Sequence, residues 1–129
     1  MSRTRTNQSA ARRARVRAYR EGLMAETLTA WLYRLRGYRI VAKRYRSPVG
    51  EIDLVAAKGT RLAFVEVKRR KTREEAAYAV TATQKRRIVR AAQYWLASHP
   101  NFAGHDIAFD VVLCAPWSWP CRVANAFSI

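Results

Sequence analysis

Three of the nine acidic residues in this 129-residue chain lie in two short apolar segments. Glu51 and Asp53 lie in the segment GEIDLV, and Glu66 lies two residues before Lys68 in the segment FVEVK. A carboxylate in such a setting costs several kcal/mol to bury unless a cation or a metal ion compensates its charge. The placement of these acids therefore favours a metal site.

The loop between the two segments decides whether Asp53 and Glu66 can meet, because side chains alternate between the two faces of a strand. A two-residue loop at residues 58–59 places Glu66 diagonal to Asp53 on the same face, and a four-residue loop at residues 58–61 places it directly opposite. A three-residue loop without a bulge places the carboxylates on opposite faces and removes the site. Lys68 shares a face with Glu66, so two of the three loops bring two carboxylates and one ammonium group together.

This combination of groups suits the hydrolysis of phosphodiester bonds. Mg²⁺ prefers oxygen ligands and is held by one or two carboxylates together with a substrate phosphate. Such an ion polarises the phosphoryl group and lowers the pKa of a bound water, while Lys68 could orient that water or stabilise charge on the phosphate. Spacing alone also allows a simpler interpretation, in which Glu51 and Asp53 lie on a solvent-exposed strand face and Glu66 and Lys68 form an ordinary surface pair.

A helix expected over residues 20–36 would bring a further acid toward these segments. Its apolar residues recur at three- and four-residue spacing, which predicts the buried stripe of an amphipathic helix that ends at Gly37. The stripe consists of Leu28, Leu32 and Leu35, with Ala25 and Trp31 beside them. Glu26 lies near the edge of this stripe and could add an outer-sphere contact or a contact to a second metal ion.

The rest of the chain alternates between strand and helix patterns. Strands are expected over residues 39–45, 51–57, 61–67 and 107–115, with a short last strand over residues 122–127. A second amphipathic helix is expected over residues 81–98, with an apolar stripe of Ile88, Ala91, Ala92, Trp95 and Leu96. The order helix, three strands, helix and one or two strands predicts a single α/β domain with a mixed central sheet flanked by helices.

A lone acid in the fourth of these strands has a structural interpretation. Asp110 falls on the face opposite Ile107, Phe109 and Val111, so it either faces solvent or pairs with an arginine.

The charge of the chain points to a polyanionic partner. The sequence has 25 lysines and arginines and a net charge of +16 at pH 7. Nucleic acid is favoured over an anionic membrane, because the basic residues lack a long amphipathic helix with an insertion face. The basic residues expected to contact nucleic acid are Arg12, Arg13, Arg15, Arg17, Arg46, Lys85, Arg86, Arg87 and Arg90.

The first of these arginines lie in a basic arm, residues 1–18, which precedes a domain over residues 19–129. The arm has no acid and is expected to be solvated, with helical structure near residues 12–19. Two interpretations stay open, namely a flexible phosphate-binding arm and a disordered solubilising tail. No apolar stretch of about 18 residues is present, nor an apolar run after the basic N-terminus, so neither a transmembrane helix nor a secretory signal is expected. These features, with two cysteines interpreted as reduced thiols, predict a cytoplasmic protein.

The two acidic segments, in order, resemble the paired motifs of the PD-(D/E)xK nuclease superfamily, whose second motif is Glu-x-Lys. More narrowly, the chain is similar to the UPF0102 family of small bacterial proteins. The resemblance runs from about residue 20 to the C-terminus and leaves the basic arm outside. Its further matches are Gly22, Ala25, Glu26, Gly37, Tyr38, Arg46, Lys85 and the segments 109–112 and 125–127.

The resemblance implies roles for individual residues. Asp53 and Glu66 would be ligands of Mg²⁺ or Mn²⁺, Lys68 the catalytic lysine and Glu26 the helix-borne acid. Additional candidates are Glu51, Gln84 and Lys85. Two positions depart from the family pattern, since Tyr45 stands where the family commonly has Asn, and Ala108 where it commonly has Arg.

The resemblance also implies a restriction-endonuclease-like fold and a metal-dependent deoxyribonuclease that acts on recombination or repair intermediates. Homodimerisation is compatible with such a fold. Two rivals are a non-catalytic nucleic-acid-binding module that keeps the nuclease fold, and a basic ribosome-associated protein.

Overall fold

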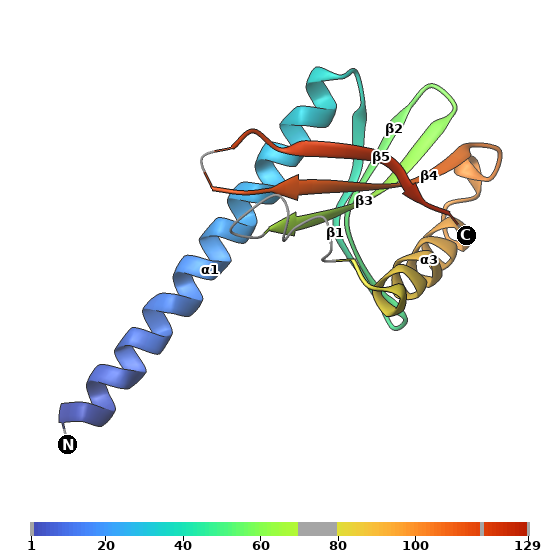
Figure 1. The fold of residues 1–129 in the computed structure, drawn as a ribbon. Coiled ribbons are helices and arrows are strands. Elements are labelled where there is room, and N and C mark those ends of the chain that lie inside the picture. The colour runs from blue at the N-terminus through green and yellow to red at the C-terminus, as the bar shows by residue number, and fades with distance from the viewer. Residues whose placement is uncertain (1, 70–79, 117, 129) are drawn as a thin grey trace.

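The computed structural model describes residues 2–69, 80–116 and 118–128 of the chain. The elements, in order, are α1 (Ser2–Leu35), β1 (Arg39–Ser47), β2 (Gly50–Lys58), β3 (Arg61–Arg69), α3 (Ala82–Ala97), the short 3₁₀ helix η1 (Pro100–Phe102), β4 (Asp106–Cys114) and β5 (Cys121–Phe127). The strands form one sheet in the order β1-β2-β3-β4-β5, in which only the β3–β4 pair is parallel (Figure 1). The predicted α/β class with a mixed sheet is confirmed.

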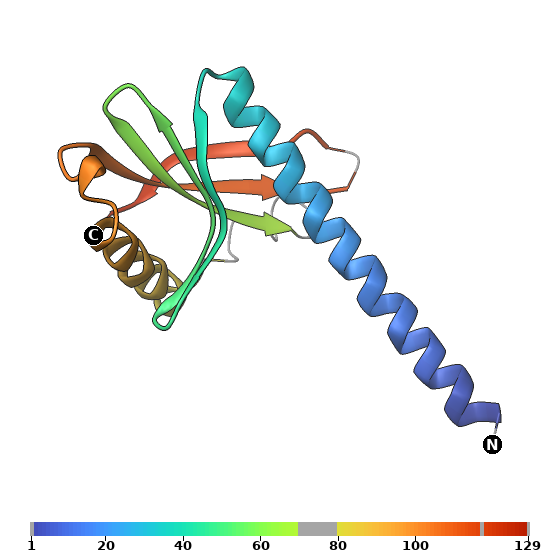
Figure 2. The same ribbon diagram turned by 180° about the vertical axis from the view of Figure 1, so that it is seen from behind.

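The two long helices cover opposite faces of the sheet. One core cluster joins Leu32 and Tyr33 of α1 to Leu54 and Val65 of the sheet. The other cluster joins α3 to the sheet through residues such as Trp95 and Phe64, whose rings meet edge to face at 5.7 Å. Figures 1 and 2 show the resulting three layers from the two sides. In the described ranges, no helix combines the length and the apolar character needed to cross a bilayer.

Helix α1 differs from its prediction in length and in the face that it buries. It is continuous from Ser2 rather than beginning near residue 20. Of the predicted leucine stripe only Leu32 is buried, while Leu28 and Leu35 are 39% and 73% exposed. The buried face instead consists of Ala25, Thr29, Ala30, Leu32 and Tyr33.

The hydrophobic pattern does not predict this buried face, because two of its residues carry hydroxyl groups. Both hydroxyls are satisfied by hydrogen bonds, since Thr29 donates to the carbonyl oxygen of Ala25 and Tyr33 donates to Asp110. A hydroxyl can be buried without a large penalty when it has such a partner.

Helix α3 follows its predicted pattern. Ile88, Ala91, Ala92 and Trp95 are buried against the sheet. Thr81 caps the N-terminus through a capping box with Gln84, which satisfies backbone N–H groups that the helix leaves free. The helix lies close to the start of β2, because a Cβ atom added at Gly50 would come within 2.7 Å of the carbonyl oxygen of Arg87. Only glycine fits at this contact.

The β2–β3 hairpin has the register that brings Asp53 and Glu66 together. Lys58 pairs with Arg61, so the loop has two residues, Gly59 and Thr60. It lies one position later than the two-residue loop expected at residues 58–59. Gly59 adopts a φ of +57°, which favours glycine at this position of a tight hairpin. Continuing this register places Asp53 opposite Glu66, the pairing predicted for the four-residue loop, and excludes the arrangement on opposite faces.

Asp110 is the centre of a buried polar cluster that joins four elements. Its carboxylate is fully buried and accepts hydrogen bonds from Arg61, from Tyr33 and from the backbone N–H of Asn125. Arg122 lies 3.4 Å away as a second cation. Burial alone would raise the pKa of Asp110, but the bonds from Arg61 and Asn125 outweigh it and lower the pKa. The predicted pairing with an arginine is confirmed.

Candidate active site

Asp53 lies where strands β2 and β3 separate. The last paired residues before this point are Leu54 and Val65. Beyond them, the backbone N–H of Val67 donates to Oδ2 of Asp53 at 2.8 Å instead of to a backbone carbonyl of β2. The side chain of Asp53 therefore occupies the gap between the diverging strands, and this bond fixes its position.

Glu66 and Lys68 form an almost buried ion pair beside Asp53. Nζ of Lys68 lies 3.3 Å from Oε1 of Glu66, and the two side chains are only 11% and 16% exposed. The interpretation of these residues as an ordinary surface pair is therefore wrong. Strand β3 holds both side chains at a point where solvent screens them weakly.

Glu26 reaches the same region from α1. Together with Asp53 and Lys68 it lines a cavity of about 210 Å³, whose other lining residues are Gly22, Ala25, Val67 and Arg69. Glu26 is itself engaged, because Nε of Arg44 donates to its Oε2 at 2.6 Å. Glu66 does not line this cavity, but it pairs with Lys68, which does.

Arg44 is a site residue that sequence reasoning missed. It lies in β1 with a φ of 50°, a left-handed conformation that is uncommon for arginine. This conformation aims the guanidinium across the sheet face toward α1, where it pairs with Glu26 and lies 5.5 Å from the ring centre of Tyr19. The alternation of residue types along a strand does not indicate which residue adopts a left-handed conformation.

The site contains more negative charge than its neighbouring ammonium group can compensate. Burial and the nearby charge of Asp53 raise the pKa of Glu66 to about 7, although Lys68 opposes the shift. Burial also raises the pKa of Asp53, against the lowering effect of the Val67 N–H, and the charge of Glu26 adds to the rise. Two neighbouring carboxylates that resist ionisation together are a setting that a divalent cation would stabilise.

The donor set fits Mg²⁺ or Mn²⁺ with a small number of protein ligands. In the part of the chain that the structure describes, no group of three or more His, Cys, Asp or Glu side chains is arranged to hold a metal ion. Asp53 and Glu66 still provide two hard oxygen donors, and Mg²⁺ commonly takes only one or two carboxylates and fills its other positions with water and phosphate. The residues present are therefore compatible with such an ion.

The sequence profile of the uncharacterised protein family UPF0102 matches residues 25–114, a range that includes Glu26, Asp53, Glu66 and Lys68. The chain belongs to the UPF0102 family.

Relatives within the family cover most of the chain. A UPF0102 protein of Bradyrhizobium diazoefficiens is 52% identical over 113 residues, which are 88% of this chain and 85% of that protein. A UPF0102 protein of Parvibaculum lavamentivorans is 52% identical over 110 residues, covering 85% of this chain and 83% of that protein. A UPF0102 protein of Chelativorans is 47% identical over 118 residues, covering 92% and 95%. The resemblance to UPF0102 seen in the sequence is thus confirmed.

The additional candidates of this UPF0102 chain do not line the cavity. Glu51 is 67% exposed and faces Arg46 at 3.6 Å on the neighbouring strand. The side chain of Gln84 accepts the backbone N–H of Thr81 in the helix cap, and Nζ of Lys85 lies 5.8 Å from the ring centre of Phe127. The structure thus brings together Glu26, Asp53, Glu66 and Lys68 and leaves these three apart.

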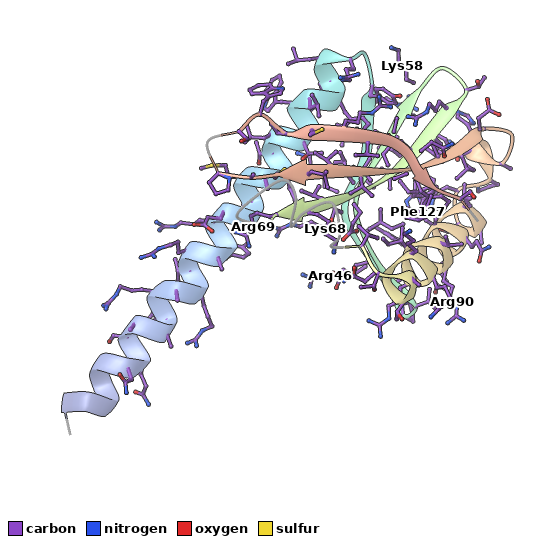
Figure 3. All side chains as sticks on the ribbon, viewed as in Figure 1. Arg46, Lys58, Lys68, Arg69, Arg90 and Phe127 are labelled. Carbon is purple, nitrogen blue, oxygen red and sulfur yellow. The ribbon has the colours of Figure 1, made fainter. Side chains whose placement is uncertain are left out.

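The predicted nucleic-acid contacts lie on α1 and α3, apart from Arg46, which is exposed on β1. Arg12, Arg13, Arg15 and Arg17 are exposed on α1, and Arg86, Arg87 and Arg90 are exposed on α3, while Lys85 is half-buried. In the view of Figure 3, Lys68 and Arg46 lie in the space between these two helices.

Proposed function

We propose that this UPF0102 protein is a metal-dependent nuclease of PD-(D/E)xK type, with a restriction-endonuclease-like fold, that hydrolyses phosphodiester bonds in DNA. The observation that carries the proposal is the nearly buried set of Asp53, Glu66 and Lys68 at the point where β2 and β3 diverge. A purely structural ion pair of Glu66 and Lys68 would not require a second carboxylate, that of Asp53, with a raised pKa beside it.

Each residue of the set has a distinct part in the proposed reaction. Asp53 and Glu66 would hold Mg²⁺ or Mn²⁺, which supplies a Lewis acid and a water of lowered pKa when bound. The ammonium group of Lys68 stabilises charge that develops on the phosphate and orients the attacking water. The Val67 N–H holds Asp53 in place. Glu26, which accepts a hydrogen bond from Arg44, contributes a carboxylate on the α1 side of the cavity.

DNA is the proposed substrate class, with recombination or repair intermediates as the first candidates. The net charge of +16 supports a polyanionic substrate, because neutralised phosphates release counterions on binding. The preference for DNA over RNA rests on the resemblance to the nuclease superfamily. A cytoplasmic location belongs to this proposal as well.

A second candidate function is a non-catalytic nucleic-acid-binding module with the same fold. It is favoured by the engagement of Glu26 with Arg44, which leaves this acid less available to a metal ion. This candidate predicts binding without cleavage.

The test is a panel of duplex, flapped, branched and single-stranded DNA incubated with Mg²⁺ or Mn²⁺. Wild-type protein is expected to cut at least one member, and Asp53→Ala is expected to cut none. Glu51→Ala is a matched control, because it removes an exposed carboxylate two residues away on the same strand. Strong, salt-sensitive binding without any cleavage, unchanged by metal ions and by Asp53→Asn, would favour the binding module.

A further inference from the structure

The N-terminal half of α1 extends away from the domain as a helical arm. Figures 1 and 2 show it projecting beyond the sheet from both sides. The helix has 34 residues, and a helix of that length measures about 50 Å. Every side chain from residue 7 to residue 21 is exposed. This arm lies outside the range that matches the UPF0102 profile, residues 25–114.

The arm is anchored to the sheet close to the candidate active site. Nη1 of Arg69, at the end of β3, donates to the carbonyl oxygen of Ala18 at 3.1 Å and to Oε2 of Glu21 at 3.0 Å. Arg44 of β1 lies over the ring of Tyr19. Because both strands hold the helix at residues 18–21, the direction of the arm is fixed relative to Asp53 and Lys68.

The charge of the arm is complementary to a phosphate backbone. Residues 2–20 contain seven arginines and no acid. Arginines three or four residues apart on one helix face, such as Arg12 and Arg15, repel one another. A polyanion bound along the arm would relieve this repulsion and release counterions.

The arginines of the arm are divided between two faces. Arg12, Arg15 and Tyr19 follow three- and four-residue spacing, which places them on the helix face that also carries Glu26 at the cavity. We define these three residues as the arm stripe. Arg13 and Arg17 lie on the opposite side of the helix.

We propose that the arm stripe binds the phosphate backbone of duplex DNA that flanks the bond held at the Asp53–Glu66 site. This inference rests on the proposed function for the position of the DNA. At about 1.5 Å per residue, Arg15 and Arg12 lie about 17 and 21 Å along the helix from Glu26. That separation equals about five or six base pairs of B-form DNA at 3.4 Å per step.

The test compares two charge-matched double variants of the full chain. Arg12→Gln/Arg15→Gln removes the charges of the stripe, and Arg13→Gln/Arg17→Gln removes the same number from the opposite face. Glutamine preserves helix propensity, which circular dichroism checks. Binding of a labelled 24-base-pair DNA duplex is measured by fluorescence anisotropy in EDTA between 50 and 200 mM NaCl.

The stripe variant is expected to lose about tenfold or more in affinity at 0.1 M salt, with a salt slope smaller by about 2. The opposite-face variant is expected to lose about threefold or less. Equal losses in the two variants would overturn the proposal, because they would indicate diffuse attraction to the whole arm. Wild-type affinity in both variants would also overturn it.

The nuclease proposal is tested separately from the arm. A difference between the two arm variants without any DNA cleavage by wild type would support the arm and contradict the nuclease. Cleavage that requires Asp53, with no difference between the arm variants, would give the reverse result.

Discussion

The backbone N–H of Val67 donates to Oδ2 of Asp53 at 2.8 Å, at the point where strands β2 and β3 stop pairing. This bond replaces a contact between the backbones of the two strands with one between a backbone and a carboxylate. It holds Asp53 beside Glu66 in a half-buried position at the cavity, and burial raises the pKa of both acids. The end of the hairpin thus produces the electrostatic setting of the site.

The first prediction concerns pH and stability in metal-free buffer. The pKa of Glu66 is raised from 4.5 to about 7, so the folded state binds this proton more tightly than the unfolded state. Its contribution to stability is complete below about pH 4.5 and is lost as the pH rises to about 7. The loss amounts to about 3 kcal/mol. The free energy of unfolding of Glu66→Gln minus that of wild type should therefore increase by a similar amount from pH 4 to pH 8.

Urea denaturation at a series of pH values in EDTA measures this difference. Titrating groups that do not interact with Glu66 are common to both proteins, so their contributions largely cancel. Asp53 interacts with Glu66, so its titration is part of the measured difference. A stability difference that stays constant from pH 4 to pH 8 would contradict the assignment of a raised pKa to Glu66.

The second prediction concerns Glu26 as a positioning residue. Glu26→Gln keeps an acceptor for Arg44 but removes a negative charge from the cavity. Changes of this kind next to metal ligands typically cost about 10–100-fold in metal affinity or activity. Glu51→Gln, which removes an exposed carboxylate outside the cavity, is the control and should change neither. Cleavage rates at a series of Mn²⁺ concentrations measure the effect, and equal behaviour of the two variants would remove Glu26 from the site.

Much of this arrangement was predictable from the sequence because it depends on local patterns. The alternating strands around a glycine-containing hairpin loop predicted β2 and β3, and the apolar stripe of α3 predicted its buried face. The pairing of Asp53 with Glu66 was one of three alternatives, since the loop length that selects the register is not encoded in alternation.

The parts that escaped prediction depend on tertiary contacts. Thr29 and Tyr33 are buried because distant or backbone atoms satisfy their hydroxyls, so the hydrophobic pattern of α1 pointed to Leu28 and Leu35 instead. The left-handed conformation of Arg44 has no signature in residue type. The first half of α1 lacks large apolar residues, so only helix propensity could have extended the predicted helix to Ser2.

The third prediction concerns the buried cluster around Asp110. Asp110→Asn would leave Arg61 and Arg122 without their shared carboxylate in a partly buried position. Removing one partner of such a pair typically costs about 3–5 kcal/mol. Asp106→Asn is the matched control at the exposed start of the same strand, and it should cost about 0.5 kcal/mol or less. Chemical denaturation measures both, and similar stabilities for the two variants would show that the cluster is not a structural clamp.

Single-turnover cleavage with Mn²⁺ is the decisive experiment on whether Asp53, Glu66 and Lys68 form a nuclease centre. The substrate is the best member of the DNA panel, and the proteins are wild type, Asp53→Asn, Lys68→Met and the control Lys85→Met. We expect Asp53→Asn and Lys68→Met to cut about a thousandfold more slowly or not at all, a loss of roughly 4 kcal/mol in transition-state stabilisation. Lys85→Met should retain cleavage within about tenfold of wild type. Cleavage by Asp53→Asn or Lys68→Met at the wild-type rate would show that these residues do not form a nuclease centre.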